Sequence, residues 1–215
     1  MAANAALAVA VMGGRAGVVA LIGQDKYGRD SLTDLQRRGV DVRFVSTIDA
    51  PTFWTLALLA VDGEKSLVQF HTPAVQANWE GFNWSLLKET ACIHAIAVEG
   101  DQILNLFEKA RALGVMTSLG MEGDAYGKKG SPELLECTDL LVVNVAAALS
   151  IDSDPRKAIS RFHELGVATV ILTRGAQGCL LSDRAGHEYV VAGHKVETKD
   201  TTGAGDCFAG AFAFG

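Results

Sequence analysis

The segment best suited to chemistry is a run of small residues that opens directly into an apolar helical pattern. It reads Asp200-Thr201-Thr202-Gly203-Ala204-Gly205-Asp206, and the helical pattern from Cys207 to Phe214 follows. Glycine lets a backbone approach a ligand closely, and the first amides of a helix lack intrahelical partners and carry partial positive charge. This helix start is therefore suited to an anion, above all to phosphate. Asp206 falls in the first helical turn, beside the place where that anion would bind.

A carboxylate beside a bound phosphate is the arrangement that phosphoryl transfer needs. The attacking hydroxyl group must lose a proton, and the charge of the transferring group must be stabilised. Asp206 would take the proton, and the backbone amides of the turn would stabilise the charge. The alternative is a purely structural role, in which Asp206 is a capping carboxylate beside a glycine-rich turn.

A second glycine-rich turn, residues 173–178, follows a β-prone run and reads Thr-Arg-Gly-Ala-Gln-Gly. The end of a strand is a usual place for ligand contacts in α/β sheets. The turn is not a GxGxxG fingerprint, and the chain contains no GxxxxGK[ST] phosphate loop. A tight β-hairpin leading into residues 179–182 explains the same turn about as well, so both interpretations stay open.

The elements that would position these turns alternate between short β-type runs and helical patterns. Such alternation indicates an α/β fold with a mainly parallel sheet, helices on both faces and right-handed crossovers. Strands are predicted at residues 17–22, 94–98, 115–119, 140–143 and 168–173, and helices at residues 1–12, 31–38, 102–113, 155–165 and 207–214.

One segment interrupts this alternation. Residues 53–61 and 65–71 are β-prone and are joined by Asp62-Gly63, a hairpin turn signal. No helix separates the two runs, so we expect an antiparallel pair outside the main sheet. A small β flap over a site and a plain edge extension both fit this pattern.

Composition excludes several classes of protein. The 215 residues contain 19 Lys+Arg against 25 Asp+Glu, with a net charge of −6, which disfavours a nucleic-acid-binding surface. Four scattered cysteines, without a Cys-x-x-Cys pair, indicate reduced thiols in the cytoplasm. No apolar run reaches the ~18 residues of a membrane span. The apolar start lacks a basic region and runs into Gly13-Gly14, so we interpret it as a buried helix and not as a secretion signal.

Taken together, the two turns resemble those of the PfkB or ribokinase-like sugar kinase family. The DTTGAGD run resembles the family's C-terminal signature, and Thr173-x-Gly175-x-x-Gly178 resembles its nucleotide turn. Asn4-Ala5-Ala6 resembles the family's Asn-x-Ala segment, and residues 22–28 with Gly39-Val40-Asp41 resemble its G-x-D-x-x-G…GVD block. The resemblance spans the chain and implies a single ribokinase-like domain over residues 1–215, with a β lid at about residues 42–72.

The resemblance also implies roles for individual residues. Asp206 would be the catalytic base, and the amides of Gly203, Ala204 and Gly205 would form the anion hole. Asn144, Thr173, Gly175 and Gly178 would bind ATP, which is used with Mg²⁺. Asn4 would bind sugar hydroxyls, although a helix N-cap is the alternative. Glu99 would be an acidic substrate contact, Asp200 and Thr202 would bind a monovalent cation such as K⁺, and the lid would make a homodimer contact.

The chain departs from the family pattern in two respects. Family members carry Asn-x-x-Glu after the strand that corresponds to residues 140–143, whereas this chain has Asn144 and then Ala147 in place of the glutamate. The resemblance ties that glutamate to Mg²⁺, so metal handling is expected to be altered. Both ends are also short of the family's length, so we expect a fragment that lacks the first strand and the adenine-binding end.

The leading functional hypothesis is an ATP-dependent kinase that phosphorylates a sugar hydroxymethyl group. A nucleoside kinase on the same fold is the alternative among enzymes. A sugar- or nucleotide-binding homologue with little turnover is the alternative outside them. A dinucleotide-dependent oxidoreductase is disfavoured, because no Rossmann glycine fingerprint follows the first strand.

Overall fold

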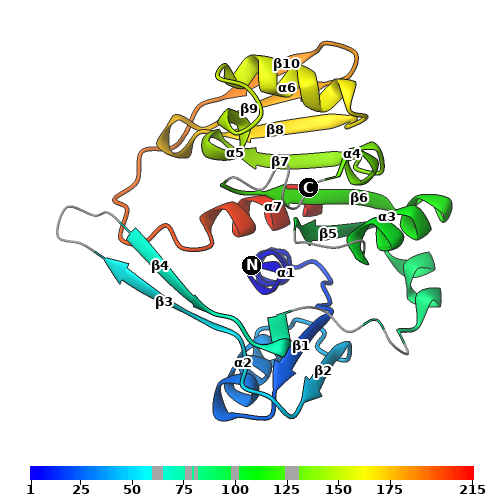
Figure 1. Ribbon diagram of the computed structural model, residues 1–215, viewed down its shortest axis with the longest axis vertical. Helices are drawn as coiled ribbons and strands as arrows, with labels where there is room; N and C mark the ends of the chain where they lie inside the picture. The colour runs from blue at the N-terminus through cyan, green and yellow to red at the C-terminus, as the bar shows by residue number, and fades with distance from the viewer. Residues whose placement is uncertain (60–64, 76–78, 80–81, 98–101, 124–130) are drawn as a thin grey trace. The chain divides into compact units, whose positions relative to one another are not determined.

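A computed structural model describes residues 1–59, 65–75, 79, 82–97, 102–123 and 131–215 (Figure 1). The chain divides into two compact units, one of residues 1–5 with 84–215 and one of residues 6–83. Helix α1 (Ala2–Val11) begins in the first unit and ends in the second. We describe each unit by itself, and the single kinase domain expected over residues 1–215 stays a prediction.

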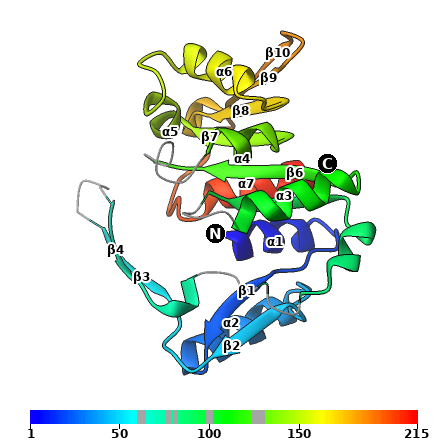
Figure 2. The ribbon, with the colours of Figure 1, turned by 45° about the vertical axis from the view of Figure 1, so that its right-hand side comes forward.

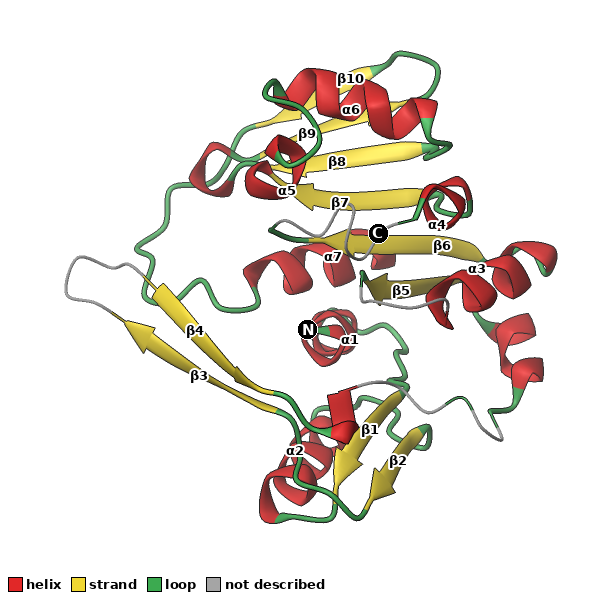
Figure 3. Cartoon of the chain, in the orientation of Figure 1, coloured by secondary structure: helices red, strands yellow, loops and turns green. Residues whose placement is uncertain are grey.

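The larger unit is built on a six-stranded sheet in the order β10-β9-β8-β7-β6-β5 (Figure 3). Strands β5 to β8 are parallel, whereas β9 runs antiparallel to both β8 and β10. The mainly parallel sheet predicted from the sequence is therefore confirmed, with a hairpin added at one edge. The strands are β5 (Cys92–Ile96), β6 (Met116–Met121), β7 (Leu140–Asn144), β8 (Thr169–Thr173), β9 (Cys179–Asp183) and β10 (Glu188–Val191).

Helices cover both faces of this sheet (Figure 2). Leu140, Val142 and Ile171 form a buried cluster with Ala209 of α7 on one face. Because side chains alternate along a strand, Leu141 and Val143 point to the opposite face, and both are fully buried. Buried side chains on both faces of β7 explain why it reads as a continuous apolar run. The helices of this unit are η2 (Trp84–Glu89), α3 (Gln102–Ala112), α4 (Pro132–Glu136), α5 (Val145–Leu149), α6 (Pro155–Glu164), η3 (Gly175–Gln177) and α7 (Ala204–Phe214).

The smaller unit contains a two-stranded parallel sheet and a separate hairpin. Strands β1 (Ala20–Gly23) and β2 (Val45–Ile48) are joined through helix α2 (Lys26–Arg37), and a core of Ala6, Val18 and Val40 lies beside them. The antiparallel hairpin of β3 (Trp54–Leu59) and β4 (Lys65–Phe70) forms its own sheet, which confirms that it lies outside the main one. Its turn residues, Asp62 and Gly63, lie outside the described residues. The helix η1 (Pro73–Val75) completes this unit.

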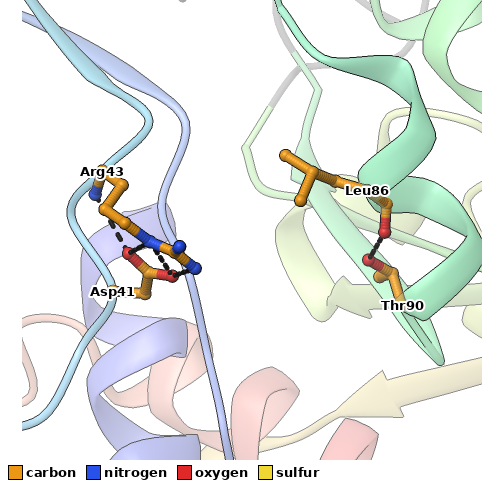
Figure 4. A network of polar contacts seen from close by, with 4 residues as sticks. All are labelled: Asp41, Arg43, Leu86 and Thr90. Carbon is orange, nitrogen blue, oxygen red and sulfur yellow. Dashed lines mark hydrogen bonds and ion pairs between the residues drawn. The ribbon is translucent and has the colours of Figure 1, made fainter.

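Local polar contacts fix the ends and loops of each unit. In the smaller unit, Arg43 pairs with Asp41 through two guanidinium nitrogens, one at 2.6 Å from Oδ2 (Figure 4). In the larger unit, the hydroxyl of Thr90 donates to the carbonyl of Leu86 at 2.9 Å, which closes the end of η2 (Figure 4). None of the described helices is long and apolar enough to cross a membrane.

Asp25 organises the block from Gly23 to Gly28. Its Oδ1 accepts hydrogen bonds from the Gly28 amide at 2.8 Å and from the Thr52 hydroxyl at 2.7 Å, and its Oδ2 accepts one from the Thr52 amide at 2.8 Å. A Cβ on Gly23 would lie 2.1 Å from the carbonyl of Ala50, and one on Gly28 would lie 2.3 Å from the carbonyl of Gly23. The glycines therefore allow a close backbone crossing, which the carboxylate ties together.

The structure corrects two boundaries predicted from the sequence and adds two strands. Helix α2 begins at Lys26 and not at Ser31, because Asp25 caps it. The first strand is limited to β1, and Gly17 makes only an isolated bridge with Asp41. Strands β2 and β10 were not predicted; β2 is a short run that carries a serine and a threonine.

The Asp25 carboxylate predicts an acid-dependent stability. The hydrogen bond from Gly28, followed by those from Thr52, lowers the pKa of Asp25 from 3.8 to about 2. Because the pKa is lower in the folded state, this stabilisation is present above pH 3.8 and is lost as the pH falls through about 2. We expect Asp25→Asn to unfold at lower urea concentration than the unchanged protein at pH 7, because an amide cannot accept on both sides.

The difference between the two proteins should shrink as the pH falls from 3.8 toward 2. Asp30→Asn is the matched control, since Asp30 lies exposed on the same helix and pairs with Lys26. Equal effects of the two substitutions at pH 7 would contradict the role given to Asp25.

Candidate functional site

Asp206 lies buried in the first turn of α7, with 6% of its surface exposed. Its Oδ2 accepts a hydrogen bond from Nδ2 of Asn4, the third residue of α1, at 2.9 Å. The amino group of Met1 lies 3.7 Å from the same oxygen. The helix N-cap suggested as an alternative for Asn4 is wrong, because Asn4 lies inside α1 and its amide holds Asp206.

Two glycines allow the first turn of α1 to lie against α7. Gly203 precedes α7 with φ of 75°, and a Cβ there would lie 2.6 Å from Nδ2 of Asn4. A Cβ on Gly210 would lie 2.2 Å from the carbonyl oxygen of Ala5. A Cβ on Gly210 would force the two helices apart, and a Cβ on Gly203 would displace the Asn4 amide from Asp206.

The turn before α7 corrects one of the predicted anion-hole residues. The amide of Ala204 donates to the carbonyl of Thr201 at 3.1 Å, so it is already used within the turn. The anion hole stays a prediction, and it is now limited to the amides of Gly203 and Gly205. Further back, Oδ1 of Asp200 accepts hydrogen bonds from the Thr202 amide at 2.8 Å and from its hydroxyl at 2.7 Å, and both residues are exposed.

A small cavity of about 20 Å³ lies at the carboxyl ends of the parallel strands. Four residues predicted from the sequence line it: Asn144, Thr173, Gly205 and Asp206. Asn144 and Thr173 are direct partners in the register of β7 and β8. The catalytic and nucleotide residues predicted from separate motifs are therefore brought together at one edge of the sheet, where parallel α/β sheets bind ligands.

The two residues of this cavity that are predicted to bind ATP also have structural roles. Oδ1 of Asn144 caps α5 by accepting a hydrogen bond from the amide of Ala147 at 2.8 Å. The hydroxyl of Thr173 donates to the carbonyl of Val143 at 3.3 Å. Ala147, where the resemblance implies a glutamate, is fully buried. A glutamate at this position would therefore place a carboxylate in the core of the described structure, at a cost in stability.

Gly175 and Gly178 lie in the turn between β8 and β9, and neither lines the cavity. Their φ angles are 56° and 85°, which favour glycine. A Cβ on Gly178 would lie 2.0 Å from the carbonyl of Val191. The tight hairpin, one of the two interpretations of this turn, is confirmed as its geometry, and ATP binding there stays a prediction.

Two further residues that sequence reasoning missed line the same cavity. His94 lies on β5 and Glu122 directly follows β6. A Cβ on Gly205 would lie 2.9 Å from Oε1 of Glu122, so this carboxylate lies beside the helix start. Polar residues on neighbouring parallel strands were the signal that could have identified them. Glu99, the predicted substrate contact, lies outside the described residues.

The donor atoms available for a metal ion are few. Among the residues that the structure describes, no group of three or more His, Cys, Asp or Glu side chains is arranged to hold one. Mg²⁺ in phosphoryl-transfer sites is held by one or two carboxylates together with substrate phosphates, and not by a complete protein cage. Glu122, which lies beside Gly205 at the start of α7, fits this manner of binding.

Comparison with known proteins identifies relatives of the whole chain. The family profile described as pfkB family carbohydrate kinase matches residues 1–215. The chain is 26% identical to the bifunctional protein HldE of Shewanella piezotolerans and 28% identical to ribokinase of Haemophilus influenzae. These alignments cover 99% and 98% of this chain, but 46% and 71% of the two relatives.

A solved structure confirms the predicted fold. The crystal structure of ribokinase from Thermotoga maritima matches with a TM-score of 0.80 and 26% identity. The match covers 99% of this chain and 71% of that chain. The ribokinase-like α/β fold expected from the sequence is therefore confirmed.

The left-handed conformation of Gly203 predicts an asymmetry between two neighbouring glycines. Gly203→Ala should lower the free energy of unfolding by roughly 1–2 kcal/mol or more, because alanine is strained at this φ and its Cβ would displace the Asn4 amide. Gly205→Ala should be neutral or slightly stabilising, since position 205 is helical and its Cβ meets only the end of the Glu122 side chain. Urea unfolding of both variants measures the difference. Equal effects would contradict the assigned geometry.

Proposed function

The chain belongs to the pfkB family of carbohydrate kinases, and we propose that it transfers the γ-phosphoryl group of ATP to a hydroxymethyl group of a sugar in the cytoplasm. The observation that supports this best is the placement of Asp206. Its buried carboxylate is held by Asn4 in the first turn of α7, beside the glycine-rich start of that helix. The residues that we propose as general base and as anion hole thus lie within one turn of one helix.

The proposed reaction uses these residues directly. The sugar hydroxyl gives its proton to the Asp206 carboxylate while its oxygen bonds to the γ-phosphorus, and the bond from that phosphorus to the β,γ-bridging oxygen breaks. The phosphorylated sugar and ADP are the products. The amides of Gly203 and Gly205, with the dipole of α7, stabilise the charge on the transferring group. A carboxylate suffices as the base because the transition state is loose and the proton leaves late.

Asn4 has two parts to play in this proposal. Its amide nitrogen donates to Asp206, which orients the base. Its amide oxygen remains the acceptor for a sugar hydroxyl, the role predicted from the sequence. Asn144, Thr173, Gly175 and Gly178 would receive ATP at the neighbouring edge of the sheet, and Glu99 would contact the substrate.

Bound Mg²⁺ would supply charge neutralisation between the nucleotide phosphates and the protein. Glu122 is the residue that would help to hold it, together with those phosphates, which leaves Asp206 for its role as the base. Because Ala147 is buried, Glu122 is the carboxylate we assign to this role in place of the missing glutamate. A K⁺ site at Asp200 and Thr202 stays an expectation, since Oδ1 of Asp200 already accepts two hydrogen bonds from Thr202.

The base assignment predicts the result of one isosteric substitution. Asp206→Asn in the whole protein should lower kcat by about 10²–10⁴-fold, because an amide cannot take the hydroxyl proton. Sugar affinity should remain nearly unchanged. The measurement is an ADP-coupled assay with pentoses, hexoses, ketose phosphates and nucleosides, alongside calorimetric binding of each compound.

Asp183→Asn is the matched control, because this half-buried aspartate on β9 pairs with His187 away from the cavity. Retained turnover in Asp206→Asn would refute the base assignment. Turnover of nucleosides alone would favour the nucleoside kinase alternative. Binding without turnover of any compound by the unchanged protein would favour the alternative of a binding homologue.

The β3–β4 hairpin supports the homodimer expected from the sequence. Trp54, Leu56, Leu58, Leu67 and Phe70 are each 39–53% exposed, and the ring of Trp54 stacks on that of Phe70 with centroids 3.7 Å apart. Exposed apolar side chains on a two-stranded sheet favour burial against a partner. We expect the protein to sediment as a dimer. Leu56→Asp with Val68→Asp, a pair of exposed partners on one face of the hairpin, should sediment as a monomer. Leu149→Asp, an equally exposed leucine of α5, is the control, and an unchanged dimer in the double variant would contradict this interface.

A further inference from the structure

His94 is a polar group of the cavity to which the proposed reaction gives no role. Its Nδ1 lies 2.9 Å from Oγ of Ser118, its direct partner in the register of β5 and β6. Ser118 is fully buried. The other ring nitrogen, Nε2, is buried without a hydrogen-bond partner among the described residues. A buried imidazole nitrogen with no partner carries a free-energy penalty, so its presence calls for an explanation.

Gly120 keeps the Nε2 edge of this ring open. A Cβ at position 120 would lie 3.4 Å from both Cε1 and Nε2 of His94 and 3.0 Å from Cδ1 of Ile96. Glycine thus leaves space at the side of the imidazole that borders the cavity. The same cavity is lined by Asp206, and its volume of about 20 Å³ is enough for one water molecule.

The charges around His94 favour a neutral imidazole that donates a hydrogen bond. Burial lowers the pKa of His94, and the negative charge of Asp206 on α7 opposes this by raising it. Glu122, after β6, is the other carboxylate that lines the cavity, whereas Asn144 and Thr173 from β7 and β8 are neutral. The amino group of Met1 adds a positive charge beside Asp206. Two carboxylates favour a hydrogen-bond donor at Nε2 over a lone pair.

We propose that His94 is a positioning residue for the base Asp206: the Ser118 hydroxyl donates to Nδ1, and the proton on Nε2 is directed through the cavity, by way of one water molecule, to the Asp206 carboxylate. The neutral imidazole then holds the base in one orientation. Protonation of the ring at low pH places a full positive charge beside the base, which weakens it. This inference rests on the proposed function, because it assigns His94 to the same reaction.

The first test does not depend on activity. In the whole protein labelled with ¹⁵N-histidine, ¹⁵N shifts report which nitrogen of His94 carries the proton, and His94→Gln identifies its signals. We expect a proton on Nε2 at pH 7 and a titration midpoint below 6.5. Asp206→Asn should move that midpoint further down, because it removes the charge that favours the imidazolium. A proton on Nδ1 would overturn the proposal, and so would a His94 titration midpoint that is unchanged in Asp206→Asn.

The second test separates positioning from mere packing. His94→Leu should lower kcat about tenfold with little change in KM for the sugar, whereas His94→Gln, whose amide can donate toward the cavity, should restore most of the loss at pH 7. In His94→Gln the acid limb of the kcat profile should move to lower pH, because no imidazolium forms there.

His163→Gln is the matched control, since both ring nitrogens of this half-buried histidine have partners, the carbonyl of Val167 and the hydroxyl of Ser182. Its profile should equal that of the unchanged protein. An unmoved acid limb in His94→Gln would refute the role of His94 even where the kinase is active. If no kinase activity is found, the proposed function fails, and the NMR titration still decides whether His94 and Asp206 are coupled.

Discussion

The hydrogen bond between Asn4 and Asp206 is the interaction on which the candidate site depends. It joins the first turn of α1 to the first turn of α7, two segments separated by 202 residues in the sequence. A buried carboxylate without such a donor would be costly, so the helices must lie close, and Gly203 and Gly210 are the residues that make this possible. The close packing of the two helices thus also determines how the Asp206 carboxylate is oriented.

The parallel strands set the second constraint. Because β5 to β8 run in the same direction, their carboxyl ends meet at one edge, and residues from four strands and one helix start line a single small cavity there. The residues that line the cavity lie on these strands, directly after β6 or on α7, and not on a long loop. Two of the side chains at the cavity therefore have a second role. Asn144 and Thr173 each also make a local hydrogen bond to the backbone.

The parts that could be predicted from sequence are those that depend on neighbouring residues. The glycine-rich turn before α7, the strand that ends at Thr173 and the hairpin of β3 and β4 all follow from local patterns. The predicted start of α2, Ser31, lies five residues after the observed start, Lys26, although Asp25 is a residue type that caps helices. The use of the Ala204 amide by Thr201 and the pairing of His94 with Ser118 depend on backbone geometry and strand register, which periodicity alone does not specify. The need for glycine at position 120 could not be predicted either, because it depends on the His94 ring on the neighbouring strand.

The long sequence separation of the bond between Asn4 and Asp206 has a consequence for the order of folding. Strands β5 to β9 contact neighbours that lie close in the sequence, and such contacts close early, whereas joining segments 202 residues apart carries a larger loop-closure entropy. A ribosome that has released the sheet has not yet supplied α7. The sheet edge therefore forms before α7 brings Asp206 to Asn4. The site that we propose for phosphoryl transfer is complete only once this contact has closed.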